Sequence, residues 1–100
     1  MKVFKGDFRE YGPRISKNGI IFTLSIKATT ENAAIIIFDK KTKKQLFEVA
    51  LRSEYAIGLV YSVEITEIDA DKICYLIKED DNCYVDPYAT AIVGRDKWAD

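Results

Sequence analysis

Two cysteines and several carboxylates are the side chains that could do chemistry in this 100-residue chain, because the sequence contains no histidine. Without histidine, Ser–His and Cys–His nucleophile pairs and every histidine-ligated metal site are excluded. Cys74 and Cys83 do not have the spacing of metal ligands, so we interpret them as reduced structural thiols. A disulfide between them stays open if their segments lie side by side.

The carboxylates form two groups, Glu67–Asp71 and Glu79–Asp81. Neither group has the ordered oxygen spacing, with its glycine, of a calcium loop. Glycosidic acid–base chemistry needs two carboxyls that face each other across a cleft, and a small sandwich offers no obvious one. The glycines never precede a Gly-Lys-Ser/Thr sequence, so there is no phosphate loop. We therefore expect no catalytic residue, no metal and no cofactor.

The charges nearly balance, with 15 Lys and Arg against 16 Asp and Glu and a net charge of −1. Such a chain has no basic surplus for phosphate backbones, which argues against a nucleic-acid partner. The lysines of Lys40–Lys44 could suggest an anionic partner, but nearby acidic residues offset them and we interpret the run as a solvated turn.

Nothing in the sequence predicts a membrane partner. The longest apolar run, Ala33–Phe38, is far shorter than the ~20 residues of a membrane span. Residues Met1–Gly12 carry five charges and no apolar stretch, so they do not resemble a signal peptide. A cytoplasmic location is the default expectation.

The apolar residues alternate with a period of two, which predicts strands. This alternation turns Phe22, Phe47, Tyr61 and Tyr75 inward, together with Leu59, and turns Ser62 outward. One domain of 100 residues is long enough to bury about 65% of its unfolded surface. We predict an all-β, immunoglobulin-like sandwich of six to seven strands. The expected strands are Ile20–Lys27, Ala33–Asp39, Leu46–Leu51, Leu59–Ile65 and Ile73–Lys78, with a short edge strand at Val3 and Phe4.

Polar turns separate these strands. Gly12-Pro13 and Asn18-Gly19 are typical turn dipeptides, and Asp39–Lys44 is expected to close a hairpin. One segment departs from the strand pattern: Asp86 can cap a helix, Pro87 suits its first position and Gly94 its end. We expect a short helical turn there, leaving the sandwich near its end.

Two aromatic residues stand out from the core pattern. Tyr55, in the loop Ser53–Gly58, is the aromatic expected to be exposed in the middle of the chain. An exposed ring can stack on the C–H face of a pyranose, so Tyr55 is the candidate carbohydrate-binding residue. Trp98 lies beyond the last expected element, where it would pack on a neighbour outside this chain.

Two sets of residues resemble the N-terminal domain of isoamylase, a carbohydrate-binding-module-like family of the α-amylase superfamily. Asn18–Leu24, Ala28–Ala33 and Ile35–Asp39 resemble its opening strands. The more specific set is Cys74-Tyr75-Leu76-Ile77, an acidic loop, Val85-Asp86-Pro87-Tyr88-Ala89, Gly94-Arg95 and Trp98. This set is similar to the segment in which the chain of that family leaves the sandwich and leads to the catalytic barrel.

The resemblance implies an accessory domain of a pullulanase-, isoamylase- or glycogen-debranching-type glycoside hydrolase. The family's catalytic carboxylates belong to the barrel, so this domain would not hydrolyse a glycosidic bond by itself. Residues 1–100 would be one N-terminal domain excised from a larger enzyme, with the catalytic barrel of the same chain as its partner. The residues expected at that interface are Asp86, Tyr88, Arg95 and Trp98.

Two other functions stay open. The domain could be an autonomous module that binds maltodextrin, an α-glucan, weakly through Tyr55. Glucan-binding members of the family present tryptophans from the middle of the sandwich, and this sequence has none between Leu46 and Tyr61. It could also be an unrelated protein-interaction sandwich.

Overall fold

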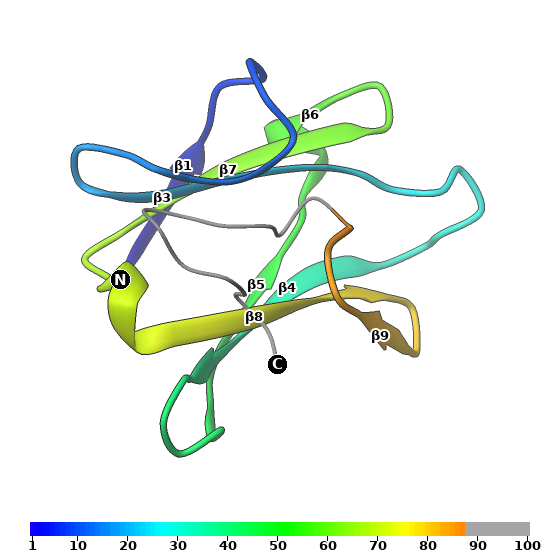
Figure 1. Cartoon of the computed structure of the whole chain (residues 1–100). Coiled ribbons are helices and arrows are strands. Elements are labelled where there is room, and N and C mark those ends of the chain that lie inside the picture. Colours follow the sequence, from blue (N-terminus) through cyan, green and yellow to red (C-terminus); the bar gives the residue numbers. More distant parts are fainter. Residues whose placement is uncertain (88–100) are drawn as a thin grey trace.

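The strands of this protein form two antiparallel sheets that stack as two layers (Figure 1). The computed structural model describes residues 1–87. It has nine strands in this range: β1 (Lys2–Lys5), β2 (Gly12–Ile15), β3 (Gly19–Ser25), β4 (Ala33–Asp39), β5 (Gln45–Ala50), β6 (Ala56–Ile57), β7 (Val60–Thr66), β8 (Ile73–Glu79) and β9 (Asn82–Tyr84). Two short 3₁₀ helices, η1 (Ser53–Tyr55) and η2 (Ala70–Lys72), lie in the connections.

The chain passes back and forth between the two sheets. Sheet A has the strand order β1-β7-β3-β2, and β6 also pairs with β7. Sheet B has the order β5-β4-β8-β9. The chain crosses from one sheet to the other between β3 and β4, between β5 and β6, and between β7 and β8. The strands that carry most of the core therefore pair with strands distant in the sequence.

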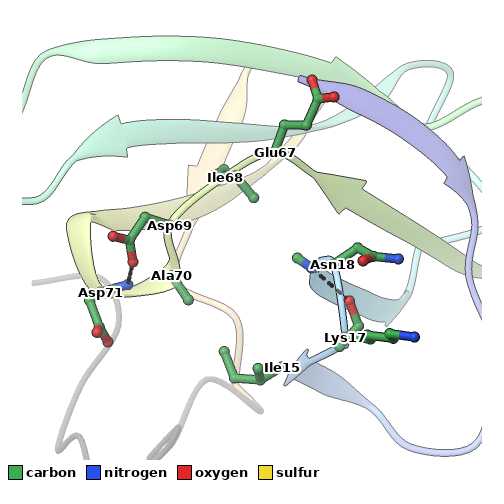
Figure 2. Close-up of a pocket in the computed structure, with 10 residues that line it drawn as sticks. Ile15, Lys17, Asn18, Glu67, Ile68, Asp69, Ala70 and Asp71 are labelled. Carbon is green, nitrogen blue, oxygen red and sulfur yellow. Dashed lines mark hydrogen bonds between the residues drawn. The ribbon is translucent and has the colours of Figure 1, made fainter.

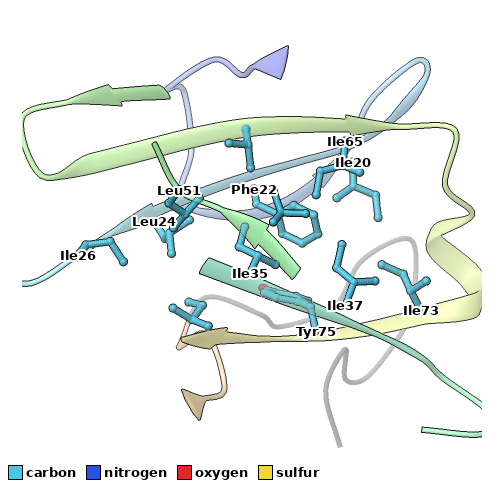
Figure 3. Packing of buried hydrophobic residues seen from close by; sticks show 13 residues of the cluster. Ile20, Phe22, Leu24, Ile26, Ile35, Ile37, Leu51, Ile65, Ile73 and Tyr75 are labelled. Carbon is cyan, nitrogen blue, oxygen red and sulfur yellow. The ribbon is translucent and has the colours of Figure 1, made fainter. Parts of the chain in front are cut away.

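The core lies between the two layers (Figure 3). Isoleucines from both sheets fill most of it, because β-branched side chains pack well on a pleated surface. The rings of Phe22 on β3 and Tyr75 on β8 meet edge to face, with centroids 4.7 Å apart. Within residues 1–87 the prediction of an all-β fold with two facing sheets is thus confirmed, as is the hairpin turn at Asp39–Lys44.

Three strands were not predicted from the sequence: β2, β6 and β9. Gly12-Pro13, expected as a turn, instead begins β2 and pairs with β3. Gly12 has a φ of 89°, a left-handed conformation that glycine adopts without strain. Pro13 is tolerated because β2 is an edge strand, where a missing N–H costs no ladder hydrogen bond.

Three side chains have a burial that differs from what alternation predicted. Ser62, expected in water, is fully buried, whereas Leu59 and Phe47, expected in the core, are 50% and 37% exposed. Leu59 precedes β7 in the tight turn at Gly58, so it does not follow the phase of the strand. Phe47 lies on edge strand β5 beside a register shift in its pairing with β4.

The C-terminal part of the sequence prediction falls mainly outside the described residues. The helical turn expected from Asp86 to Gly94 has only its first two positions inside the range 1–87. Within that range, no helix has the length and apolar character needed to cross a bilayer.

Candidate functional site

The N-terminal segment Gly6–Tyr11 runs across the outer face of sheet A, above β3 and β7 (Figure 1). The Gly6 N–H donates to the Ser62 carbonyl at 2.9 Å. The Asp7 carbonyl accepts from Ser62 Oγ at 2.8 Å and from Thr23 Oγ1 at 3.2 Å. The two hydroxyls also lie 2.9 Å from each other. These bonds satisfy the polar groups that the segment buries, which explains why Ser62 is not in water.

The side chain of Asp7 fixes the rest of this segment. Arg9 donates to both carboxylate oxygens, each at 3.2 Å, and Arg14 of β2 donates to the same carboxylate. The Arg9 hydrogen bond and the Arg14 guanidinium lower the pKa of Asp7 to about 2, against a smaller opposing effect of burial. The carboxylate therefore stays charged, and it links the segment to β2, at ordinary pH.

An aromatic hollow of about 220 Å³ lies between this segment and sheet A. Tyr11 is 45% exposed and Ile57 is 61% exposed, so both present apolar surface to solvent. Ser25 Oγ donates to the Tyr11 hydroxyl at 3.2 Å, and the Lys5 ammonium lies 5.8 Å from the centre of the Phe8 ring. The residues that line the hollow are Phe8, Arg9, Glu10, Tyr11, Thr23, Ile57 and Val60.

This combination suits binding better than catalysis. Aromatic and aliphatic side chains give a surface for the apolar face of a small ligand, and Arg9 and Glu10 give polar partners at its rim. The residues that line it include no nucleophile beside a general base.

A second hollow, of about 690 Å³ and larger than the aromatic one, lies between the β2–β3 turn and the β7–β8 connection (Figure 2). Two of its polar side chains bind the local backbone. Ser16 Oγ accepts from the Gly19 N–H at 3.0 Å, and the Asp69 carboxylate accepts from the Asp71 N–H at 3.0 Å. Its lining residues include no aromatic ring, so size alone does not make it the better ligand site.

An acidic hollow of about 620 Å³ lies on the outer face of sheet B. Lys78 and Glu48 form an ion pair across it at 3.7 Å. The Asp80 carboxylate accepts from the Glu31 and Asn32 N–H groups at 3.1 and 2.9 Å, so it also holds the β3–β4 connection. Within residues 1–87, no group of three or more acidic or cysteine side chains is placed to hold a metal ion. The lining residues are Glu31, Asn32, Ala33, Ala34, Glu48, Ala50, Lys78, Asp80 and Asp81.

Tyr55 is not the exposed aromatic platform expected from the sequence. It is half-buried at the end of η1 and packs against the hydrophobic core. Its N–H donates to the Arg52 carbonyl at 2.9 Å. Phe8 and Tyr11 line the hollow instead, and sequence reasoning missed them because they lie in no alternating run. The available signal was two aromatics in a charged stretch ahead of the first long strand.

Asp86 lies inside the sandwich, with 4% of its surface exposed. The Tyr75 hydroxyl donates to Asp86 Oδ2 at 2.8 Å. Burial, and then the Asp86 charge, raise the pKa of Tyr75, so the hydroxyl stays protonated as the donor. The side chain of Asp86 therefore has little exposed surface with which to contact another domain directly. The other expected interface residues, Tyr88, Arg95 and Trp98, lie outside the described residues.

The two cysteines are both free, and no disulfide joins them. Cys74 is buried on β8 and Cys83 is exposed on β9. The register places Cys83 opposite Lys78, four residues along β8 from Cys74. Four residues of strand span about 13 Å, well beyond the reach of a disulfide.

No protein-family model matches this chain, and no curated protein has a significantly similar sequence. Function is therefore inferred from the chain's own residues. Two features bear on it: the aromatic hollow on sheet A, and the buried contact between Tyr75 and Asp86.

Proposed function

We propose that this chain is the N-terminal accessory domain of an α-glucan debranching glycoside hydrolase and that it packs on the enzyme's catalytic barrel. The observation that carries the proposal is the Tyr75–Asp86 hydrogen bond. Tyr75 lies in Cys74–Ile77 and Asp86 lies in Val85–Ala89. These are the two segments that most resemble the isoamylase N-terminal family. A buried bond between them gives the paired motifs a physical reason to occur together.

This bond would orient the chain where it leaves the sandwich. A buried carboxylate is costly without hydrogen-bond donors, so Asp86 holds the backbone beside it against β8. The residues that follow would then start in a fixed direction toward the barrel. In this proposal the sandwich is immunoglobulin-like, Tyr88, Arg95 and Trp98 contact the barrel, and the domain positions the barrel without catalysing the reaction.

The test begins with the native protein. An antibody raised against this chain would be used to precipitate its antigen from the source cells, and the product run on a gel that contains pullulan. We expect a polypeptide much larger than 11.4 kDa that clears the pullulan. An antigen of 11.4 kDa without activity would contradict the proposal and favour a protein-interaction sandwich. In the large enzyme, Trp98→Ala should lower the melting temperature, and an unchanged value would remove Trp98 from the interface.

A second candidate function, weak binding of α-glucan, is favoured by the aromatic hollow. A glucose ring can stack on an aromatic side chain while its hydroxyls meet Arg9 and Glu10. The test is an NMR titration of the ¹⁵N-labelled chain with maltoheptaose to millimolar concentration. We expect shifts at Phe8–Tyr11 that Tyr11→Ala abolishes and Leu46→Ala, an equally exposed apolar control on the other sheet, leaves intact. The absence of shifts would exclude this function, and shifts confined to Tyr55 would return the site to the residue expected from the sequence.

A further inference from the structure

Strand β5 is the longest edge strand of the described residues. The four strands at the ends of the sheet orders are β1, β2, β5 and β9, and β5 is six residues long against four, four and three. Its apolar residues Leu46 and Phe47 are 45% and 37% exposed. An edge strand of this length presents unpaired backbone groups that can accept another strand.

The backbone pattern shows which residues face the open edge. The Leu51 N–H donates to the Ala33 carbonyl at 2.9 Å. Hydrogen-bonded and non-bonded pairs alternate in an antiparallel ladder, so Val49 and Phe47 also bond to β4. The N–H and C=O groups of Glu48 and Ala50 therefore point away from β4, toward the open edge.

The two ends of β5 carry opposite charges. The β4–β5 turn before it contains Lys41 and Lys44, both exposed, and Lys40, which is half-buried. At its other end lies the acidic hollow, which Glu48 and Ala50 of β5 itself help to line. A strand with a basic start and an acidic end is electrostatically complementary to an antiparallel copy of itself.

We propose that two copies of this chain pair through β5, antiparallel about a two-fold axis at Phe47, and join their B sheets into one. This register places the Phe47 rings side by side and Lys44 opposite Ala50 of the second copy. Each lysine turn then lies beside the acidic hollow of the other copy. An isologous contact of this kind closes on itself as a dimer. The proposal does not depend on the proposed function.

The backbone part of the proposal is tested by sedimentation velocity on the 100-residue chain from 10 µM to 1 mM. We expect a mass that rises toward twice 11.4 kDa as concentration increases. Glu48→Pro removes an N–H that faces the open edge and no bond to β4, so it should raise the dimer dissociation constant at least tenfold. Glu48→Ala, which removes the same side chain but keeps the N–H, is the matched control and should keep most of the dimer.

The electrostatic contribution to the dimer is tested by exchanging charges between the lysine turn and the acidic hollow. This experiment also tests the proposal if Glu48→Pro fails to fold. Lys44→Glu and Asp81→Lys should each weaken the dimer several-fold, and the double variant should restore it. Added salt should weaken the native dimer. A chain that stays monomeric to 1 mM would overturn the proposal, as would a dimer that neither Glu48→Pro nor the charge variants affect.

Discussion

Alternation assigns polar residues to the outer face of sheet A and to the outer face of sheet B in the same way. In the structure the two faces have different surroundings. On sheet A the segment Gly6–Tyr11 covers the strands, and the hydroxyls of Thr23 and Ser62 bind its backbone. On sheet B no described backbone segment pairs beyond β5, and Glu48 stays in contact with water. An outward-facing polar residue therefore does not by itself show whether its face is open.

The two faces also differ in how their apolar surface is shielded. Ile36, on the outer face of sheet B, is only 4% exposed. Its register neighbour Glu48 pairs with Lys78, and the aliphatic stems of such side chains can cover an isoleucine. Hydrogen bonds to the backbone of Gly6–Tyr11 close the face of sheet A, whereas on the face of sheet B the described cover is the Glu48–Lys78 side-chain pair. Substitutions should consequently cost more on sheet A.

The largest effect is expected where the covering segment approaches sheet A most closely. A Cβ atom at Gly6 would lie 2.4 Å from Ser62 Oγ and 3.0 Å from Ile21 Cγ2. Gly6→Val should therefore lift the segment and lower the free energy of unfolding by about 3 kcal/mol. Urea denaturation measures this change. An unchanged midpoint would show that the segment does not cover the face in solution.

The second-largest effect is expected at the hydrogen bond between Tyr75 and Asp86. Tyr75→Phe keeps the ring against Phe22 but removes the hydrogen bond to the buried Asp86 carboxylate. A hydrogen bond to a charged group contributes about 1.5–3 kcal/mol, so the melting temperature should fall by several degrees. Calorimetry with Tyr61→Phe as the matched control separates this bond from a general effect of losing a hydroxyl. Equal melting temperatures for native chain and Tyr75→Phe would contradict the anchoring role.

A smaller loss is expected for Ser62→Ala, which removes a donor to the Asp7 carbonyl and a partner of Thr23. Leaving buried polar groups with fewer partners should cost about 1–2 kcal/mol. Ser53→Ala, at an exposed position in η1, should cost almost nothing. If both variants unfold at the same urea concentration, Ser62 does not hold the segment.

Acid should release the segment of sheet A through Asp7. The pKa of Asp7 is lowered to about 2 in the folded chain, below its ordinary value of 3.8. The folded state therefore binds fewer protons than the unfolded state, so this contribution is complete above pH 4 and is lost as the pH falls toward 2. NMR titration of the side-chain carboxyl should show a midpoint near 2, and Arg9→Gln should raise it. A midpoint near 3.8 would contradict the pairing.

The smallest effect belongs to the open face of sheet B. The ion pair between Lys78 and Glu48 is partly exposed, and such pairs contribute about 0–1 kcal/mol. Lys78→Gln should therefore change the urea midpoint little, less than Ser62→Ala does. A loss of stability larger than that of Ser62→Ala would contradict the stated difference between the outer faces of sheets A and B.

The sequence predicted the interior well because alternation reports burial directly. Phe22 and Tyr75 lie in the core as expected, and the hairpin at Asp39–Lys44 has the expected strands on either side. The three short strands were missed because two to four residues are too few to show a period. Ser62 was misplaced because alternation assigns a face but does not show what covers it.

The candidate site could not be predicted for a related reason. Tyr55 lies in a loop, and loop position suggested exposure, but η1 turns the chain so that the ring packs on the core. Phe8 and Tyr11 line a hollow only because hydrogen bonds from Ser62 and Thr23 hold their segment on the sheet. Those bonds join residues that are far apart in the sequence, which local patterns do not report.

Amide hydrogen exchange tests most directly the contrast between a closed sheet A and an open sheet B. The Gly6 N–H, bonded to Ser62, should be protected at every protein concentration, whereas the Glu48 and Ala50 N–H groups should exchange rapidly in dilute solution. Their protection should appear only as concentration rises and the β5 edges pair. Rapid exchange at Gly6, or protection of Glu48 that is independent of concentration, would contradict the account.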